Sequence, residues 1–181
     1  MSSRIARASS PSLDASALRL AIVLSNYHPA LGEGLLAGAR HCLEAHGLTP
    51  GSVPVIRVPG AFEVPQAVSR LIARHVPPLN AVVALGVLIR GETLHFEVLS
   101  HQVCRGLDEV ARATGVPVTF GILTVDAEAQ ARDRAGRGTN NKGWEATLAA
   151  IEMASLFQRL ETSETQPDEA PGARSRRRMG R

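Results

Sequence analysis

Four short apolar runs, separated by longer segments of helical periodicity, are the feature that most constrains the fold of this chain. The runs are rich in β-branched residues and cover residues 18–24, 53–58, 81–88 and 116–123. Nearly continuous apolar sequence is typical of strands that are buried on both faces. The pattern therefore predicts a parallel sheet of four strands with helices covering both of its faces.

The segments between and after these runs have the apolar spacing of amphipathic helices. We expect helices over residues 31–46, 62–74, 95–114, 127–134 and about 143–160. The first of them ends at Gly47 and has on one stripe the apolar residues Leu35, Leu36, Ala39 and Leu43. The last is expected to bury Leu148, Ile151, Met153, Leu156 and Phe157. This order of elements predicts an α/β protein of three layers.

Composition sets further limits on the chain. It has 181 residues, of which 44% are hydrophobic, enough for one domain with a sizeable core. The longest stretch without a charged residue, 75–89, contains two prolines and is too short to cross a membrane. Cys42 and Cys104 have no metal-ligand or redox spacing. We therefore expect no disulfide framework, no metal site and a cytoplasmic location.

The charge is concentrated at the two ends of the chain. The net charge is +3, but residues 17–162 carry 13 basic and 13 acidic side chains. Residues 1–16 and 163–181 lack apolar periodicity, and the second segment ends in an arginine cluster. We expect these segments to be disordered extensions of one domain over 17–162. The neutral domain argues against a nucleic-acid partner, which would have to bind the arginine cluster alone.

The residues that follow each strand are candidates for a binding site, because ligands of parallel sheets bind beyond the carboxyl ends of the strands. Tyr27, the only tyrosine, could stack on a flat heterocycle or cover the start of a helix. Gly60 permits close approach of the backbone to a ligand. Glu63 could accept hydrogen bonds from ligand hydroxyls or interact with a helix dipole.

The densest group of candidate residues follows the third strand. Gly91, Glu92 and Thr93 are expected to open a helix whose free amides could hold an anion. His95 lies in the first turn of that helix, and histidine is the residue type that exchanges protons near neutral pH. Further on, Lys142 is the only lysine among 20 basic residues, which favours a role for a compact ammonium group there.

Four segments, in order, resemble the 6,7-dimethyl-8-ribityllumazine synthase family over roughly residues 18–158. They are Val-Pro-Gly-Ala-Phe-Glu-Val-Pro at 58–65, Leu-Gly-Val-Leu-Ile-Arg-Gly-Glu-Thr-Leu-His-Phe at 85–96, Phe-Gly-Ile-Leu-Thr at 120–124, and Arg-Ala-Gly with Asn-Lys-Gly within 134–143. The resemblance implies a flavodoxin-like three-layer α/β/α sandwich and the penultimate step of riboflavin synthesis. In that step 5-amino-6-(D-ribitylamino)uracil condenses with 3,4-dihydroxy-2-butanone 4-phosphate, without a cofactor, and phosphate and water are released.

The resemblance also implies a role for each matching residue. Tyr27 would stack on the pyrimidine, Glu63 would bind ribityl hydroxyls, and His95 would move protons. The remaining contacts to the pyrimidine and its ribityl chain would come from Gly60, Ala61, Phe62, Val87, Leu88 and Ile89. The phosphate would be received by Gly91, Glu92 and Thr93. An adjacent subunit would supply Phe120, Arg134 and Lys142.

A loop that enters a helix after the last strand should lie away from the strand ends, so Arg134 and Lys142 reach the same pocket only from a neighbouring copy. The family forms pentamers, and some members assemble twelve pentamers into an icosahedral shell. The short segment between Arg134 and Lys142 is like that of shell-forming members. Tyr27 and His28 depart from the family, which often has Phe or Trp followed by Asn.

Three other functions remain open from the sequence. A non-catalytic binder of flavin-like compounds would have little need of His95, Arg134 and Lys142 together. A flavodoxin-like electron carrier would have a Ser-, Thr- and Gly-rich phosphate loop after the first strand, where this chain has Asn-Tyr-His-Pro. A structural shell component that recruits cargo through the arginine cluster could also be a catalyst.

Overall fold

A computed structural model describes residues 13–138 and 140–164 of the chain. Its centre is a parallel sheet of four strands in the order β2-β1-β3-β4. The strands are β1 (Leu20–Ser25), β2 (Val55–Val58), β3 (Ala81–Ile89) and β4 (Val118–Val125). The predicted four-stranded parallel sheet is confirmed, although β1, β2 and β4 begin two residues later than the apolar runs.

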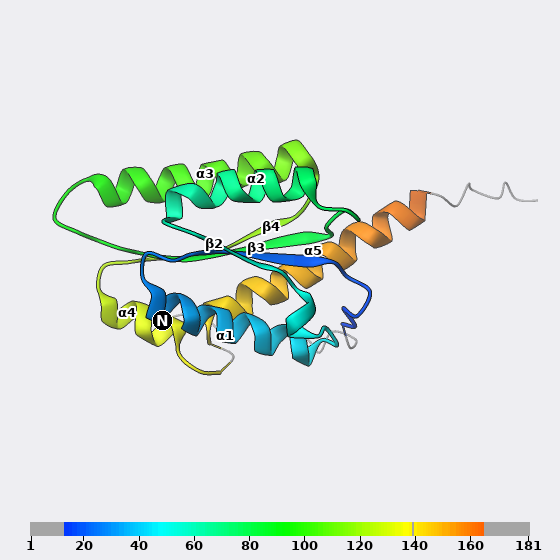
Figure 1. The fold of residues 1–181 in the computed structure, drawn as a ribbon, viewed down its shortest axis with the longest axis horizontal. Helices are drawn as coiled ribbons and strands as arrows, with labels where there is room; N and C mark the ends of the chain where they lie inside the picture. The colour runs from blue at the N-terminus through cyan, green and yellow to red at the C-terminus, as the bar shows by residue number, and fades with distance from the viewer. Residues whose placement is uncertain (1–12, 139, 165–181) are drawn as a thin grey trace, which may run out of the picture.

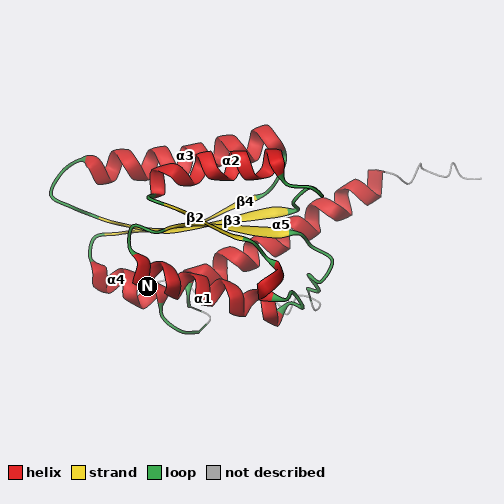
Figure 2. Cartoon of the chain, viewed as in Figure 1, coloured by secondary structure: helices red, strands yellow, loops and turns green. Residues whose placement is uncertain are grey.

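Helices cover both faces of the sheet, as Figures 1 and 2 show. The helices on one face are α2 (Val64–Arg74) and α3 (His95–Thr114). Those on the other face are α1 (Pro29–Ala45), α4 (Glu128–Ala135) and α5 (Lys142–Glu164). Short 3₁₀ turns, η1 (Pro50–Ser52) and η2 (Ala61–Glu63), flank β2. The three-layer α/β/α sandwich expected from the sequence is therefore confirmed.

Burial on both faces explains why the two central strands are apolar without alternation. All six residues of β1 and the first eight of β3 are buried. Ile22 and Leu24 pack into the core beneath α1 and α5, whereas Ala21 and Val23 pack into the core beneath α2 and α3. Alternate residues thus supply two separate cores, each closed by one helical layer.

The strand order reverses between β1 and β3, which places a crevice at the carboxyl edge of the sheet. Strand β1 pairs in parallel with β2 on one side, where Ser25 aligns with Val58, and with β3 on the other. Connections from β1 and β3 leave the sheet toward opposite layers at this point. Such a switch point is where ligands bind in open α/β sheets.

The inner face of α5 differs from the prediction. Ile151 is fully buried as expected, but Met153 and Leu156 are each 37% exposed. The buried stripe is made mainly of small residues: Ala146, Thr147, Ala150, Ile151 and Ala154. Small side chains let α5 approach the sheet closely, and the larger apolar side chains lie on the outer face. The prediction that Met153 and Leu156 are buried is wrong.

The N-terminal side of the domain begins earlier than expected. Ala15 is fully buried, and its amide donates to the carbonyl of His46 at 2.8 Å. Residues 13–16, assigned from sequence to an extension, therefore pack at the end of α1. The expectations for residues 1–12 and 165–181 lie outside the described residues. Within the described ranges, no helix is long and apolar enough to span a membrane.

Candidate active site

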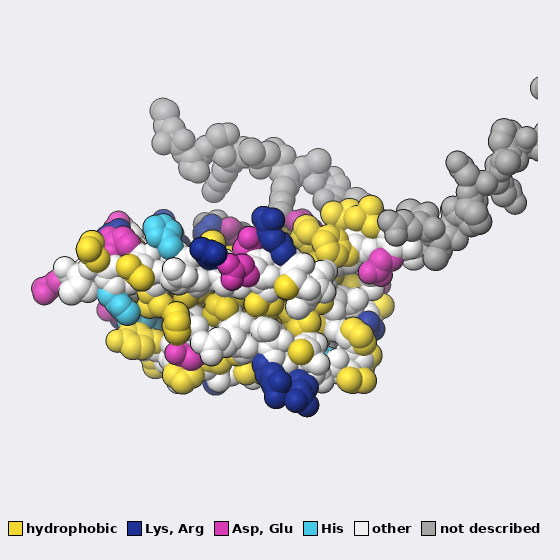
Figure 3. All heavy atoms as spheres, turned by 90° about the horizontal axis from the view of Figure 1, so that it is seen from above, with side chains coloured by type: hydrophobic (Ala, Val, Ile, Leu, Met, Phe, Trp, Pro, Cys, Tyr) yellow, Lys and Arg dark blue, Asp and Glu magenta, His cyan; other side chains and the backbone are white. Residues whose placement is uncertain are grey.

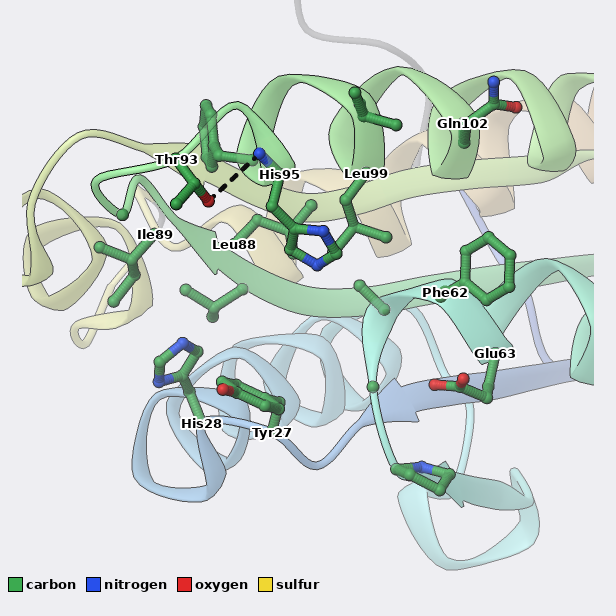
Figure 4. Close-up of a pocket in the computed structure, with 17 residues that line it drawn as sticks. Tyr27, His28, Phe62, Glu63, Leu88, Ile89, Thr93, His95, Leu99 and Gln102 are labelled. Carbon is green, nitrogen blue, oxygen red and sulfur yellow. Dashed lines mark hydrogen bonds between the residues drawn. The ribbon is translucent and has the colours of Figure 1, made fainter.

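A cavity of about 650 Å³ opens at the carboxyl edge of the sheet (Figure 4). It is lined by the segments that follow β1, β2 and β3 and by the first turns of α3. Eleven of the residues singled out from the sequence line it: Tyr27, Gly60, Ala61, Phe62, Glu63, Val87, Leu88, Ile89, Gly91, Thr93 and His95. Glu92 is absent from its lining among the described residues.

Two rings from the β1–α1 connection form one wall. The side chain of Tyr27 is 73% exposed, and its ring centroid lies 5.0 Å from that of His28 in an edge-on arrangement. Figure 4 shows both rings facing the cavity. So large an exposed aromatic surface favours stacking on a ligand over a cover for the start of α1. His28 was treated in the sequence only as a departure from the family, but it lines the cavity as well.

The turn after β2 forms the far end of the cavity. The side chain of Glu63 lies over Gly60, where an added Cβ would come 2.9 Å from Glu63 Oε2. Within the described part of the chain, the Glu63 carboxylate makes no capping hydrogen bond to α2, although Glu63 is its N-cap residue. Figure 4 shows the carboxylate directed into the cavity beside Phe62. This geometry supports a ligand-binding role for Glu63 rather than a capping role.

The segment after β3 differs from the prediction that Gly91, Glu92 and Thr93 open a helix. Helix α3 begins at His95, and Leu94 is its N-cap residue, so the three residues form a loop in front of it. We call residues 91–94 the anion loop. Thr93 Oγ1 accepts a 3.4 Å hydrogen bond from the His95 amide, which brings the loop against the first helical turn. The predicted helix over residues 95–114 is confirmed, but the expectation that residues 91–93 open it is wrong, because polar residues of this kind suit both a helix start and a loop.

His95 is the first residue of α3 and points into the cavity. In Figure 4 its ring hangs between Leu88 and Leu99 and faces Tyr27 and His28 from the opposite wall. The end of β3 forms the floor, where Val87 is 3% exposed. An imidazole above an apolar floor and beside an exposed loop is suited to transferring protons to and from a bound molecule.

The three residues expected from a neighbouring copy line a different cavity, of about 470 Å³. Phe120, Arg134 and Lys142 meet there beside the outer edge of β4, away from the first cavity. Arg134 donates to the carbonyl of Gln130 at 3.0 Å, and Lys142 Nζ lies 2.6 Å from Glu145 Oε2. Lys142 is also the first residue of α5 and not a loop residue. One chain therefore groups these residues but does not bring them to His95.

Two residues that hold the segments next to these cavities were missed in the sequence. Asn141 is 2% exposed, and its side chain caps the start of α5 by accepting from the amides of Gly143 and Trp144. Arg90 forms ion pairs with Asp126 and Glu97. An asparagine directly before a helix is a recognisable capping signal for Asn141. The sequence holds no comparable signal for Arg90, whose partners lie on two other elements.

The described residues contain no group of three or more His, Cys, Asp or Glu side chains that could hold a metal ion. Within this part of the chain, the polar groups of the first cavity instead come from separate elements: Tyr27, His28, Glu63, Thr93, His95 and Gln102. Such a set can bind a polyol, an anion and a planar ring at different points of one cavity.

Known proteins that are similar to this chain share one description. The sequence model of the family described as 6,7-dimethyl-8-ribityllumazine synthase matches residues 17–158. A Kineococcus radiotolerans protein of that name is 54% identical over 143 residues, which are 77% of this chain and 85% of the relative. Proteins of the same name from Aquifex aeolicus (43% over 148 residues; 82% of this chain and 95% of the relative) and Pyrococcus furiosus (45% over 143 residues; 79% and 87%) are also similar.

Proposed function

The chain belongs to the 6,7-dimethyl-8-ribityllumazine synthase family, and we infer that it catalyses the condensation of 5-amino-6-(D-ribitylamino)uracil with 3,4-dihydroxy-2-butanone 4-phosphate. It is therefore a transferase of riboflavin biosynthesis. The observation that carries this inference is one cavity that joins an aromatic wall, a carboxylate end and a loop with His95 beside it. These are the features that a ring, a polyol chain and a phosphate ester require.

We propose that the pyrimidine lies between Tyr27 and the apolar end of β3. The exposed Tyr27 ring offers a stacking face, and Val87, Leu88 and Ile89 supply the opposing wall. The ribityl chain would then extend toward Phe62 and Glu63 at the far end, with Gly60 and Ala61 leaving room for it. A carboxylate accepts hydrogen bonds from hydroxyl groups, which suits Glu63 to this end of the cavity.

The phosphate group is proposed to bind at the anion loop. Gly91 is exposed, lines the cavity and has no side chain, so a ligand can approach the loop backbone closely there. Thr93 contributes a hydroxyl, whereas Glu92 is not expected to contact the phosphate directly, since it does not line the cavity. The position of His95 beside this loop suits proton transfer while the imine forms and the phosphate leaves.

Much of the rate acceleration should come from holding both substrates together. The cavity offers His95 beside the anion loop, His28 on the wall that His95 faces, and side chains for orientation along the rest of its length. Fixing two reactants in contact can supply a large part of a condensation barrier. Imine formation, phosphate elimination and ring closure then follow without a cofactor.

We propose that the active site is completed by a second copy of the chain. Phe120, Arg134 and Lys142 form one exposed group at the edge of β4, and none of these three described residues lines the His95 cavity. Phe120 is 43% exposed, and apolar side chains also reach the surface over α3 and α5: Leu94, Val98, Met153, Leu156 and Leu160. Seen from the α2 and α3 side, hydrophobic side chains form patches at the surface (Figure 3). Exposed apolar patches of this kind favour association between copies.

The proposed assembly is a cyclic homopentamer, with a shell of twelve pentamers as the larger alternative. Each interface of a ring is heterologous, so one face of a copy can supply Arg134 while the opposite face supplies His95. Light scattering would distinguish a particle of five 19.2 kDa chains from one of sixty. We also place the protein in the cytoplasm, since Cys42 and Cys104 are both free thiols.

The function is tested by incubating the purified protein with both substrates and recording the fluorescence of the lumazine product. Product is expected only when both substrates are present, with stoichiometric release of phosphate. A protein that binds the product tightly but never forms it would instead be a non-catalytic binder of flavin-like compounds.

A further inference from the structure

The guanidinium of Arg90 joins two elements behind the anion loop. Its Nε donates to Asp126 Oδ1 at 2.7 Å, just beyond β4, and its Nη1 contacts Glu97 Oε1 in the first turn of α3. Arg90 itself continues β3, since its amide donates to the carbonyl of Val125 at 2.8 Å. One side chain thus ties together the ends of two strands and the start of a helix.

The same side chain supports a wall of the active-site cavity. Arg90 Cζ lies 4.6 Å from the centroid of the Phe96 ring, and Phe96 lines the cavity next to His95. A guanidinium over an aromatic face is attracted to the ring and restricts its rotation. Arg90 therefore contacts the back of the structure that carries His95, without itself lining that cavity among the described residues.

The anion loop has little support of its own. Residues 91–95 are exposed, and the bond between Thr93 Oγ1 and the His95 amide is long at 3.4 Å. The helix ladder begins only with the Val98 amide, which donates to Leu94 at 3.2 Å. The position of the loop consequently depends on how its two ends are held. Arg90 holds the end at β3 through Asp126 and the end at α3 through Glu97.

The charge of Arg90 is already satisfied by these partners. The hydrogen bonds that Arg90 donates to Asp126 and Glu97 raise the pKa of Arg90 above its usual value. The pKa of Glu97 is lowered, first by a hydrogen bond from its own backbone amide and then by Arg90. Two carboxylates offset the single positive charge of Arg90, which weakens its attraction for a phosphate, and only arginine has the planar fork that serves both partners and a ring.

We propose that Arg90 is a positioning residue that fixes the anion loop and the first turn of α3 in the geometry that receives the phosphorylated substrate. This inference rests on the proposed function of that loop. It assigns Arg90 an indirect action, through the loop amides and His95, rather than a contact with the phosphate.

The test compares Arg90→Ala and Arg90→Lys with the unchanged protein by steady-state kinetics in both substrates. We expect the KM for the butanone phosphate to rise about tenfold in Arg90→Ala, because the loop is no longer held in the geometry that receives the phosphate. The KM for the pyrimidine should change less than about twofold, because Tyr27 and Glu63 lie on other elements. The KM of Arg90→Lys for the butanone phosphate should lie between that of the unchanged protein and that of Arg90→Ala, since an ammonium can pair well with only one carboxylate.

Hydrogen exchange supplies a readout that does not depend on activity. In Arg90→Ala, the Val98 amide should exchange faster, because its bond to the Leu94 carbonyl closes the first turn of α3, while amides of the later turns stay unchanged. Arg105→Ala is the matched control, since Arg105 lies further along α3 and pairs with Glu109 at 2.7 Å. This control should leave both KM values and the exchange of the Val98 amide as they are.

The proposal is overturned if Arg90→Ala leaves exchange of the Val98 amide unchanged, or if it raises both KM values equally. If Arg90→Ala fails to fold, Glu97→Gln and Asp126→Asn take its place, and each must raise the KM for the butanone phosphate selectively. Absence of that effect in both would also overturn it. If the unchanged protein makes no lumazine, the proposed function fails, while the exchange experiment still decides whether Arg90 holds the loop.

Discussion

The Asn141 side chain donates a hydrogen bond through Nδ2 to the carbonyl oxygen of Gly34, at 2.9 Å and across 107 positions of sequence. The same amide group donates to Gly136 at 2.7 Å, and Oδ1 accepts from the Gly143 amide at 2.8 Å. Asn141 therefore locks the α4–α5 turn onto α1. Because Lys142 follows Asn141 directly, these hydrogen bonds also fix the backbone position from which the Lys142 side chain extends.

A substitution at Gly38 should break this lock. An added Cβ would come 2.1 Å from Asn141 Oδ1, so Gly38→Ala must displace a buried, fully bonded side chain. We expect a loss of roughly 1–3 kcal/mol in the free energy of unfolding, although alanine normally favours a helix interior. Gly51→Ala is the control, since nothing lies within 4 Å of its Cβ. Denaturant unfolding at one protein concentration should show no loss for the control, and an unchanged Gly38→Ala would contradict the lock.

Removal of the Tyr27 ring should weaken binding of the pyrimidine selectively. Stacking of a base on an aromatic side chain contributes about 1–3 kcal/mol, so Tyr27→Ala should raise the KM for the pyrimidine by about 5- to 150-fold. Tyr27→Phe keeps the ring and should stay within about twofold, unless the hydroxyl binds substrate. Steady-state kinetics in each substrate separates these effects. An equal rise in both KM values would show that Tyr27 supports the fold of the cavity instead.

Loss of the Arg134 guanidinium should affect the other substrate. Arg134→Ala removes a charge-assisted hydrogen bond of about 1.5–3 kcal/mol and should raise the KM for the butanone phosphate far more than that for the pyrimidine. Arg132→Ala is the control, because Arg132 lies on the same helix and pairs with Glu128 outside the second cavity. If Arg132→Ala has the same effect, the result reflects damage to α4 rather than a lost phosphate contact.

The buried thiol of Cys42 should make stability fall at high pH. Burial, with a smaller contribution from Glu152, raises the pKa of Cys42 from 9.0 to about 12. Because the folded state holds this proton more tightly, the associated stability is present below pH 9 and is lost as the pH rises toward 12. Cys42→Ala should remove this part of the pH dependence of unfolding. If the free energy of unfolding of Cys42→Ala still falls equally steeply between pH 9 and pH 12, other groups cause the loss of stability.

The sheet and the cavity could be predicted from the sequence because both depend on local patterns. Continuous apolar runs specify doubly buried strands, and the residues after parallel strands must meet at one edge. The bounds of α3 could be predicted as well, but Gly91, Glu92 and Thr93 were assigned to its opening and instead form a loop, since such residues suit both. The buried face of α5 was misjudged because periodicity alone does not say whether alanines or larger residues face the sheet.

The contacts that Arg90 and Asn141 make with residues distant in the sequence could not be predicted. Arg90 meets Asp126 at a separation of 36 residues, and Asn141 meets Gly34 at 107. Such pairs depend on how the elements pack in three dimensions, which no local spacing reveals. Both residues support functional segments from behind, so residue type alone gives them no functional signal.

The most direct test of the shared active site is co-assembly of two variants, His95→Ala and Arg134→Ala. Each alone should be slow, with turnover of His95→Ala reduced by about 100-fold or less. If each site takes His95 from one copy and Arg134 from the next, random mixing in equal amounts restores both residues in about a quarter of the sites. Activity of about a quarter of the unchanged protein is therefore expected after joint refolding or co-expression. Activity no higher than the mean of the two separate variants would show that each chain forms its site alone.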